Sequence, residues 1–121
     1  MNNFEIIHDL KVELADDAQE YARMAAHGFW EKAVEAEGAE EQELRSKSER
    51  AYASYWIARA EYWGNAAEQA REFTYQAAAL SELRAREHEA EAEHCAARAE
   101  IAFDRSNYHQ AEAVQLRGEA E

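Results

Sequence analysis

The near absence of helix-breaking residues constrains this chain more than any other feature. Proline does not occur, and glycine occurs only four times in 121 residues. Alanine, glutamate, glutamine and arginine, which are strong helix formers, dominate the sequence. Alanine alone supplies 28 residues, and because it buries little area we expect a thin, closely packed core. The sequence predicts an all-α fold of a few long helices in a single domain, residues 1–121.

Apolar spacing and capping signals divide the chain into segments. The expected helices cover approximately residues 3–36, 44–80, 81–104 and 107–117. An acidic loop is expected over residues 36–43, with Gly38 ending the first helix, and the run "DRSN" at 104–107 is typical of a turn. The pattern leaves open a break near residue 16 and turns at 64–65 and 80–81.

The segment 44–80 carries aromatic residues at alternating spacings of three and four, which is typical of a coiled-coil-like seam. The residues assigned to this core or oligomer seam are Tyr52, Tyr55, Trp56, Arg59, Tyr62, Trp63 and Phe73. We therefore expect a small helical bundle or a long antiparallel helical hairpin with seams rich in alanine and aromatics. A helix of about 36 residues is about 54 Å long, which exceeds the width of a compact domain of this size, so a homodimer is expected.

Arg59 has two interpretations. It lies within three or four residues of four aromatic rings, a spacing that allows cation–π contacts on one helix face. It could lie in the bundle seam, paired with a carboxylate of another helix, or it could anchor a partner interface. A stacking platform for single-stranded nucleic acid would look similar, but it would need a positive groove.

The segment 81–104 presents two weakly apolar faces. One comprises Leu83, Ala90, His94, Ala97 and Ile101, and the other Ala85, His88, Ala92, Ala96, Ala99 and Phe103. The pattern predicts a helix with neighbours on both sides.

Charge sets the class of partner. The formal net charge is -13, with -9 in residues 1–44, +1 in 45–80 and -5 in 81–121. Direct binding to nucleic acid or to an anionic membrane is disfavoured, and a basic protein partner is favoured. The candidate partner-binding residues are Glu35, Glu37, Glu40, Glu41, Glu43, Glu87, Glu89, Glu91 and Glu93.

Motifs for catalysis, metals and targeting are weak. No phosphate-binding loop or nucleophile triad is evident, so we expect a non-enzymatic protein without a cofactor. Glu91 and His94 have the spacing of a di-metal ligand pair, repeated by Glu5 and His8, which keeps a carboxylate metal bundle as an alternative. One cysteine, no signal-peptide pattern and no long apolar run favour a cytoplasmic location.

These features predict an acidic module that inhibits a basic, nucleic-acid-binding partner by imitating DNA phosphates. In general style the chain looks like small bacteriophage or mobile-element proteins, which implies an anti-defence role. The alternatives are a purely structural, self-assembling helical protein and the di-metal bundle.

Overall fold

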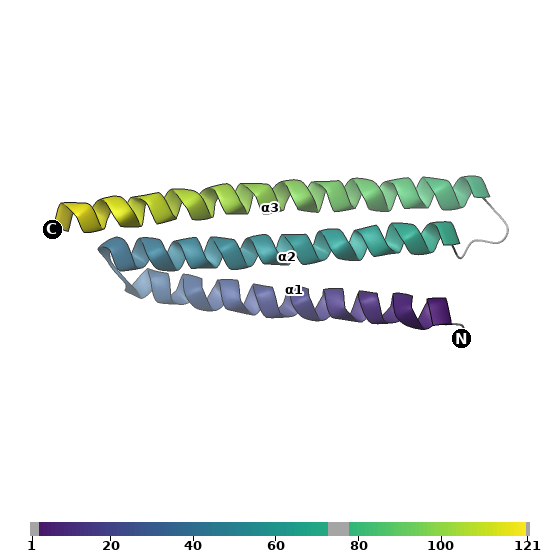
Figure 1. Ribbon diagram of the computed structural model, residues 1–121, viewed down its shortest axis with the longest axis horizontal. Helices are drawn as coiled ribbons and strands as arrows, with labels where there is room; N and C mark the ends of the chain where they lie inside the picture. Colours follow the sequence, from purple (N-terminus) through teal and green to yellow (C-terminus); the bar gives the residue numbers. More distant parts are fainter. Residues whose placement is uncertain (1–2, 73–77, 121) are drawn as a thin grey trace.

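In the computed structural model the described residues form three long helices (Figure 1). It describes the backbone of residues 3–72 and 78–120, and the side chains of residues 16–72 and 80–119. Helix α1 spans Asn3–Glu35, α2 spans Gly38–Glu72 and α3 spans Ala78–Ala120. The prediction of an all-α protein with long helices is confirmed for these residues.

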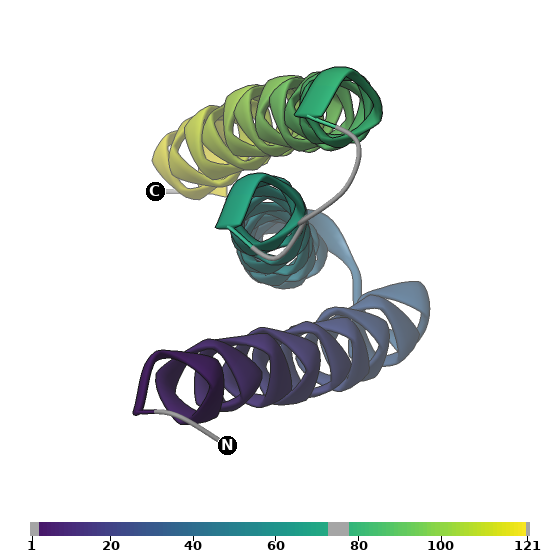
Figure 2. The same ribbon diagram turned by 90° about the vertical axis from the view of Figure 1, so that its right-hand side faces the viewer.

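The helices run up, down and up in a single layer with α2 in the middle (Figures 1 and 2). Helix α2 packs against both α1 and α3, whereas α1 and α3 do not pack against each other anywhere in the described backbone. The C-terminal end of α3 lies at the same end of the layer as the connection between α1 and α2. Each outer helix therefore has one neighbour within the chain, and α3 lacks the second neighbour that its sequence predicts.

The expected acidic loop over 36–43 is wrong, because α2 already begins at Gly38. Only Ala36 and Glu37 lie between the helices, and the Ala36 amide donates to the Ala33 carbonyl at 3.2 Å. Gly38 has a φ of 64°, a left-handed conformation that glycine adopts without steric cost. A dense run of glutamates is typical of a loop, but here Glu40 and Glu41 lie in the first turn of α2, where acids stabilise a helix.

The predicted turn at 104–107 is also wrong, since α3 continues without interruption to Ala120. Ser106, which resembles a helix cap in the sequence, is instead fully buried against α2. Ser46 and Ser106 each donate a hydroxyl hydrogen bond to the other's backbone carbonyl at 2.9 Å. The points left open at 16 and 64–65 fall inside helices. The expected helix over 44–80 is wrong at its end, because α2 ends at Glu72 and α3 already begins at Ala78, which places 80–81 inside α3.

Small side chains make up the core, as the alanine content predicts. The buried residues are Ala22, Ala26, Ala33, Ala53, Ala58, Ala67, Ala85, Cys95, Ala99, Ala102 and Ala113, with Ser46, Ser81 and Ser106. Small residues let helix backbones approach closely but contribute little buried apolar area each. In the part of the chain described, no helix contains a stretch long and apolar enough to traverse a bilayer.

Candidate functional site

The first group of candidate acidic residues lies where α1 connects to α2. Glu35, Glu37 and Glu40 are exposed. Glu41 accepts from Arg45 at 2.9 Å, and Glu43 forms an ion pair with Arg117 of α3. Three of the five carboxylates are thus free of ion pairs within the described residues and face solvent at one end of the layer.

The second group winds around α3 instead of forming one face. Glu87, Glu91 and Glu93 are exposed, whereas Glu89 turns toward α2 and pairs with Arg71. The two acidic groups are also distant from each other. Glu43 contacts Arg117, which lies 26 residues beyond Glu91, or about 39 Å along the helix. The predicted acidic residues therefore form two separate surfaces.

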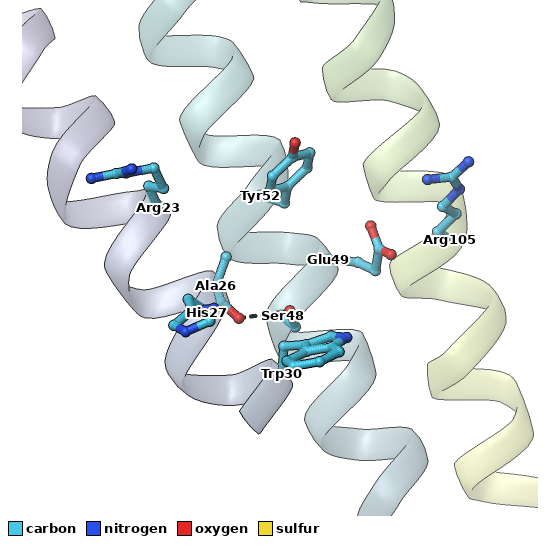
Figure 3. A pocket seen from close by; sticks show the side chains of 8 residues that line it. All are labelled: Arg23, Ala26, His27, Trp30, Ser48, Glu49, Tyr52 and Arg105. Carbon is cyan, nitrogen blue, oxygen red and sulfur yellow. Dashed lines mark hydrogen bonds between the residues drawn. The ribbon is translucent and has the colours of Figure 1, made fainter. Parts of the chain in front are cut away.

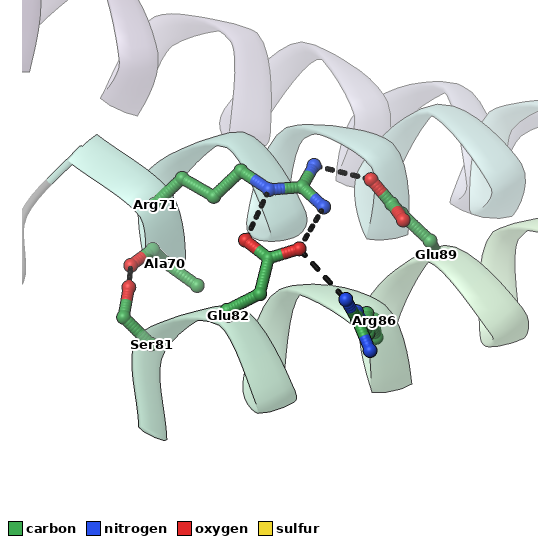
Figure 4. Close-up of polar contacts among 6 residues, drawn as sticks. All are labelled: Ala70, Arg71, Ser81, Glu82, Arg86 and Glu89. Carbon is green, nitrogen blue, oxygen red and sulfur yellow. Dashed lines mark hydrogen bonds and ion pairs between the residues drawn. The ribbon is translucent and has the colours of Figure 1, made fainter. Parts of the chain in front are cut away.

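A four-residue ion-pair network ties α2 to the beginning of α3 (Figure 4). Arg71 donates Nε and Nη2 hydrogen bonds to Glu82 at 3.1 Å each, and it also binds Glu89. Arg86 reaches the same Glu82 carboxylate at 3.4 Å. The hydrogen bonds from Arg71 lower the pKa of Glu82 and of Glu89 below the ordinary glutamate value. Beside the network, Ser81 donates to the Ala70 carbonyl.

The aromatic cluster of α2, which we define as Tyr52, Tyr55, Trp56, Tyr62 and Trp63, lies before and after Arg59 in the sequence, and two of its rings contact Arg59. The Arg59 guanidinium lies 5.7 Å from the Tyr55 ring and 5.5 Å from the Trp56 ring, and Nη1 donates to the Tyr55 hydroxyl at 3.0 Å. That hydrogen bond raises the pKa of Arg59. The expected carboxylate partner of Arg59 is absent from the described residues, and its Nε is buried without a hydrogen-bond partner there.

Helix α3 contributes to this cluster through residues that the sequence did not assign to it. The His88 ring stacks on Trp63 with centroids 5.2 Å apart, and the Arg98 guanidinium lies 5.9 Å from the Trp56 ring. Tyr52 is exposed and the other cluster residues are half-buried. The cluster therefore covers the α2–α3 interface from one side. Phe73, which the sequence placed in the same seam, lies outside the described residues.

One end of the cluster opens into a shallow groove of about 430 Å³ (Figure 3). Its floor is α2, with α1 on one side and α3 on the other. The lining residues are Arg23, Ala26, His27, Trp30, Ser48, Glu49, Tyr52 and Arg105. The arginine and aromatic side chains suit contact with an acidic or aromatic group, although Arg23 already pairs with Glu20 at 3.1 Å. The spacing of Arg23, His27 and Trp30 on one helical face was the signal that could have located the α1 side.

The possible metal ligands do not come together. Glu91 and His94 are both exposed on α3, and no group of three or more His, Cys, Asp or Glu side chains among the described residues could hold a metal ion. Cys95 is fully buried beside Arg59, so it does not join them. The side chains of Glu5 and His8 lie outside the described ones.

Comparison with known proteins adds no relationship to this geometry. No family model, no curated protein and no solved structure matches the chain.

Proposed function

We propose that this protein is a non-enzymatic, acidic protein-binding module that acts as a homodimer and inhibits a basic, nucleic-acid-binding partner. The observation that supports it most is the exposed group Glu35, Glu37 and Glu40, which has no counter-ion within the described residues. A concentrated, unpaired negative surface attracts a basic site over a long range and speeds the encounter. A nucleic-acid-processing enzyme presents such a basic site.

The magnitude of the charge limits how the protein could imitate DNA. Helix α3 has 43 residues and is about 64 Å long, so the net charge of -13 amounts to about one charge per 5 Å of its length. Duplex DNA carries one charge per about 1.7 Å. The whole rod is therefore a weak mimic, and mimicry depends on local groups such as the turn between α1 and α2.

The test is capture of partners from a nuclease-treated bacterial lysate at low and at high salt, with the bound proteins identified by mass spectrometry. We expect a nucleic-acid-processing enzyme that binds at low salt and is released at high salt. Charge reversal of Glu35, Glu37 and Glu40 to lysine should abolish capture. The matched control reverses Glu61, Glu68 and Glu72, which are exposed on α2. Equal loss in both variants, or an empty lane for the native protein, would contradict the proposal.

A second candidate, a structural self-assembling protein, is favoured by the apolar residues that α3 exposes away from α2. Leu83, Ile101, Tyr108 and Val114 are all large and exposed. Concentration-dependent assembly with no captured partner would favour this candidate over an inhibitor.

A further inference from the structure

A second groove, of about 430 Å³ and almost entirely apolar, runs between α2 and α3. The residues that line this α2–α3 groove are Ile57, Ala60, Glu61, Ala96, Ala99, Glu100 and Phe103. Ile57 and Phe103 are 39% and 38% exposed, although both side chains are large and apolar. The α2–α3 groove therefore presents apolar surface that no residue of the described chain covers.

The α2–α3 groove and the aromatic cluster lie on opposite sides of the same interface. Successive residues of an α-helix are rotated by about 100°, so residues two positions apart point about 160° away from each other. Glu61 follows Arg59 by two positions, and Glu100 follows Arg98 by two. Both arginines lie against the Trp56 ring. The two glutamates therefore point to the other side of the interface, where the groove opens.

Four carboxylates flank the α2–α3 groove in two rows. Glu61 and Glu68 lie seven residues apart on α2, and Glu93 and Glu100 lie seven residues apart on α3, a step of about 10 Å on each helix. Glu61 and Glu100 line the same groove, and the two helices are antiparallel, so Glu68 and Glu93 also lie across from each other (Figure 1). All four are exposed, and none forms an ion pair within the described residues.

The carboxylates of the groove lack the counter-ions that the interface has on either side of it. Arg71 and Arg117 each pair with glutamates of the facing helix, one beyond each end of the groove. Between them, residues 57–68 and 92–103 contain no lysine or arginine except the two that contact Trp56. The groove is thus an apolar surface with two negative edges and no cation beside them.

The shape and charge of the α2–α3 groove fit one amphipathic, basic helix. Such a helix lays its apolar face into the groove against Ile57 and Phe103, and lysine or arginine along its two edges reaches the two rows of carboxylates. A symmetric second copy does not fit, because it meets its partner through the same surface and would bring the two sets of carboxylates together. An anionic membrane surface would be repelled for the same reason.

We propose that the α2–α3 groove binds an amphipathic helix of another protein, with basic residues about seven positions apart along both edges paired to the four carboxylates. The proposal goes beyond the proposed function and does not rest on it. Glu40, which belongs to the group that supports the inhibitor, lies 21 residues before Glu61, or about 32 Å along α2. Enzyme capture without a helix bound in the groove would overturn this inference alone, and helix binding without enzyme capture would contradict only the inhibitor.

The test measures the binding of a synthetic peptide to the full chain by isothermal titration calorimetry at low and at high salt. The peptide is an amphipathic helix of about 18 residues, or about 27 Å, with leucine and alanine on one face and lysine along both edges. A second peptide carries glutamate in place of every lysine. We expect the lysine peptide to bind, more weakly at high salt, and the glutamate peptide not to bind. Absence of binding by the lysine peptide, or equal binding of both peptides, would overturn the proposal.

A matched pair of variants locates the binding site. Ala96→Lys places a cation in the α2–α3 groove and should weaken binding of the lysine peptide about tenfold or more. Ala97→Lys adds the same charge at the next exposed position, about 100° further around α3, and should bind like the native chain. Thermal unfolding checks that both variants fold. Equal affinity of the two variants would overturn the proposal.

Reversal of the carboxylates tests their role directly. E61K/E100K should also weaken binding about tenfold or more, whereas D16K/D17K, at exposed positions of α1, changes the net charge equally and should keep the native affinity. Native affinity in E61K/E100K would overturn the proposal. Sedimentation velocity of the chain alone tests the other occupant, because a dimer that E61K/E100K loses and D16K/D17K keeps would assign the groove to a second copy and overturn the proposal as well.

Discussion

The two helix–helix interfaces of the layer are built differently. Along the α2–α3 interface, side-chain hydrogen bonds occur near both ends, and ring contacts of Trp56 and Trp63 lie between them. His109 contacts Gln42 at 2.7 Å, Ser46 and Ser106 bond reciprocally, and Arg71 binds Glu82. Across the α1–α2 interface the described side chains provide one hydrogen bond, from Ser48 to the Ala26 carbonyl at 2.8 Å. The Lys47 ammonium also lies 5.9 Å from the Phe29 ring.

The comparison shows how an alanine-rich chain obtains a defined helix register. Alanine alone tolerates sliding, because one small side chain packs much like the next. Buried polar groups do not tolerate it, since an unpaired buried hydroxyl costs about 1–3 kcal/mol. The α2–α3 pair is therefore fixed in register at both ends, and α1 is the helix that we expect to separate first.

The largest effect is expected from Ser106→Leu in the α2–α3 interface. The larger side chain must force two closely packed helices apart, and Ser46 loses its hydroxyl partner. We expect a loss of about 3 kcal/mol in the free energy of unfolding, measured by urea denaturation. Gln110→Leu, at an exposed position of α3, is the control and should be nearly neutral. A neutral Ser106→Leu would mean that the interface is not closely packed.

Ala33→Leu applies the same overpacking to the α1–α2 interface, where Ala33 is fully buried. We expect a cost of about 2 kcal/mol that falls on α1 alone. Hydrogen exchange should show faster exchange of α1 amides, while α2 and α3 keep their protection. Val34→Leu at the neighbouring exposed position serves as control. Equal loss of protection in all three helices would show that the layer unfolds as one unit.

The connection between α1 and α2 gives an intermediate effect. Gly38→Ala places a side chain at a φ of 64° and should destabilise the protein by about 1 kcal/mol, although nothing lies within 4 Å of the new Cβ. Gly28→Ala inside α1 also meets no atom within 4 Å and should stabilise it by about 0.5–1 kcal/mol. The midpoints of thermal unfolding of the two variants should therefore shift in opposite directions relative to the native chain. Midpoint shifts of the same sign would refute the assignment of strain to Gly38→Ala.

The smallest effect concerns the ion-pair network around Arg71. Because the folded-state pKa of Glu82 and of Glu89 is lowered, their stabilising contribution is complete above the ordinary glutamate pKa of 4.5. It is lost as the pH falls through the lowered folded-state values. In the native chain the urea midpoint should therefore fall with pH over this range, and Arg71→Gln should make that fall smaller. Below the lowered pKa values the substitution should have little effect. An unchanged dependence of the urea midpoint on pH would argue against the network. The change should be small because the groups are exposed.

The sequence located the aromatic cluster and the acidic groups but not their surroundings. Spacings of three and four place Tyr52, Trp56 and Arg59 on one helical face, which is a property of a single helix. The sequence could not show that His88 and Arg98 reach the same cluster. They lie on α3, far from the cluster in sequence, and contact it only because of the register in which α3 packs on α2. The turn predicted at 104–107 was wrong because a serine such as Ser106 suits a turn and a buried hydrogen bond between helices equally well.

Helix formation itself was determined by the sequence, because propensity and the absence of proline act locally. The tertiary structure decided where helices end and which faces they bury. Local turn signals at 104–107 were overridden because continuing α3 buries Ser106 with its hydrogen bonds satisfied and extends packing on α2. The arrangement as a layer, with α1 and α3 apart, likewise follows from which small residues lie on each side of α2, a choice that requires all three helices at once.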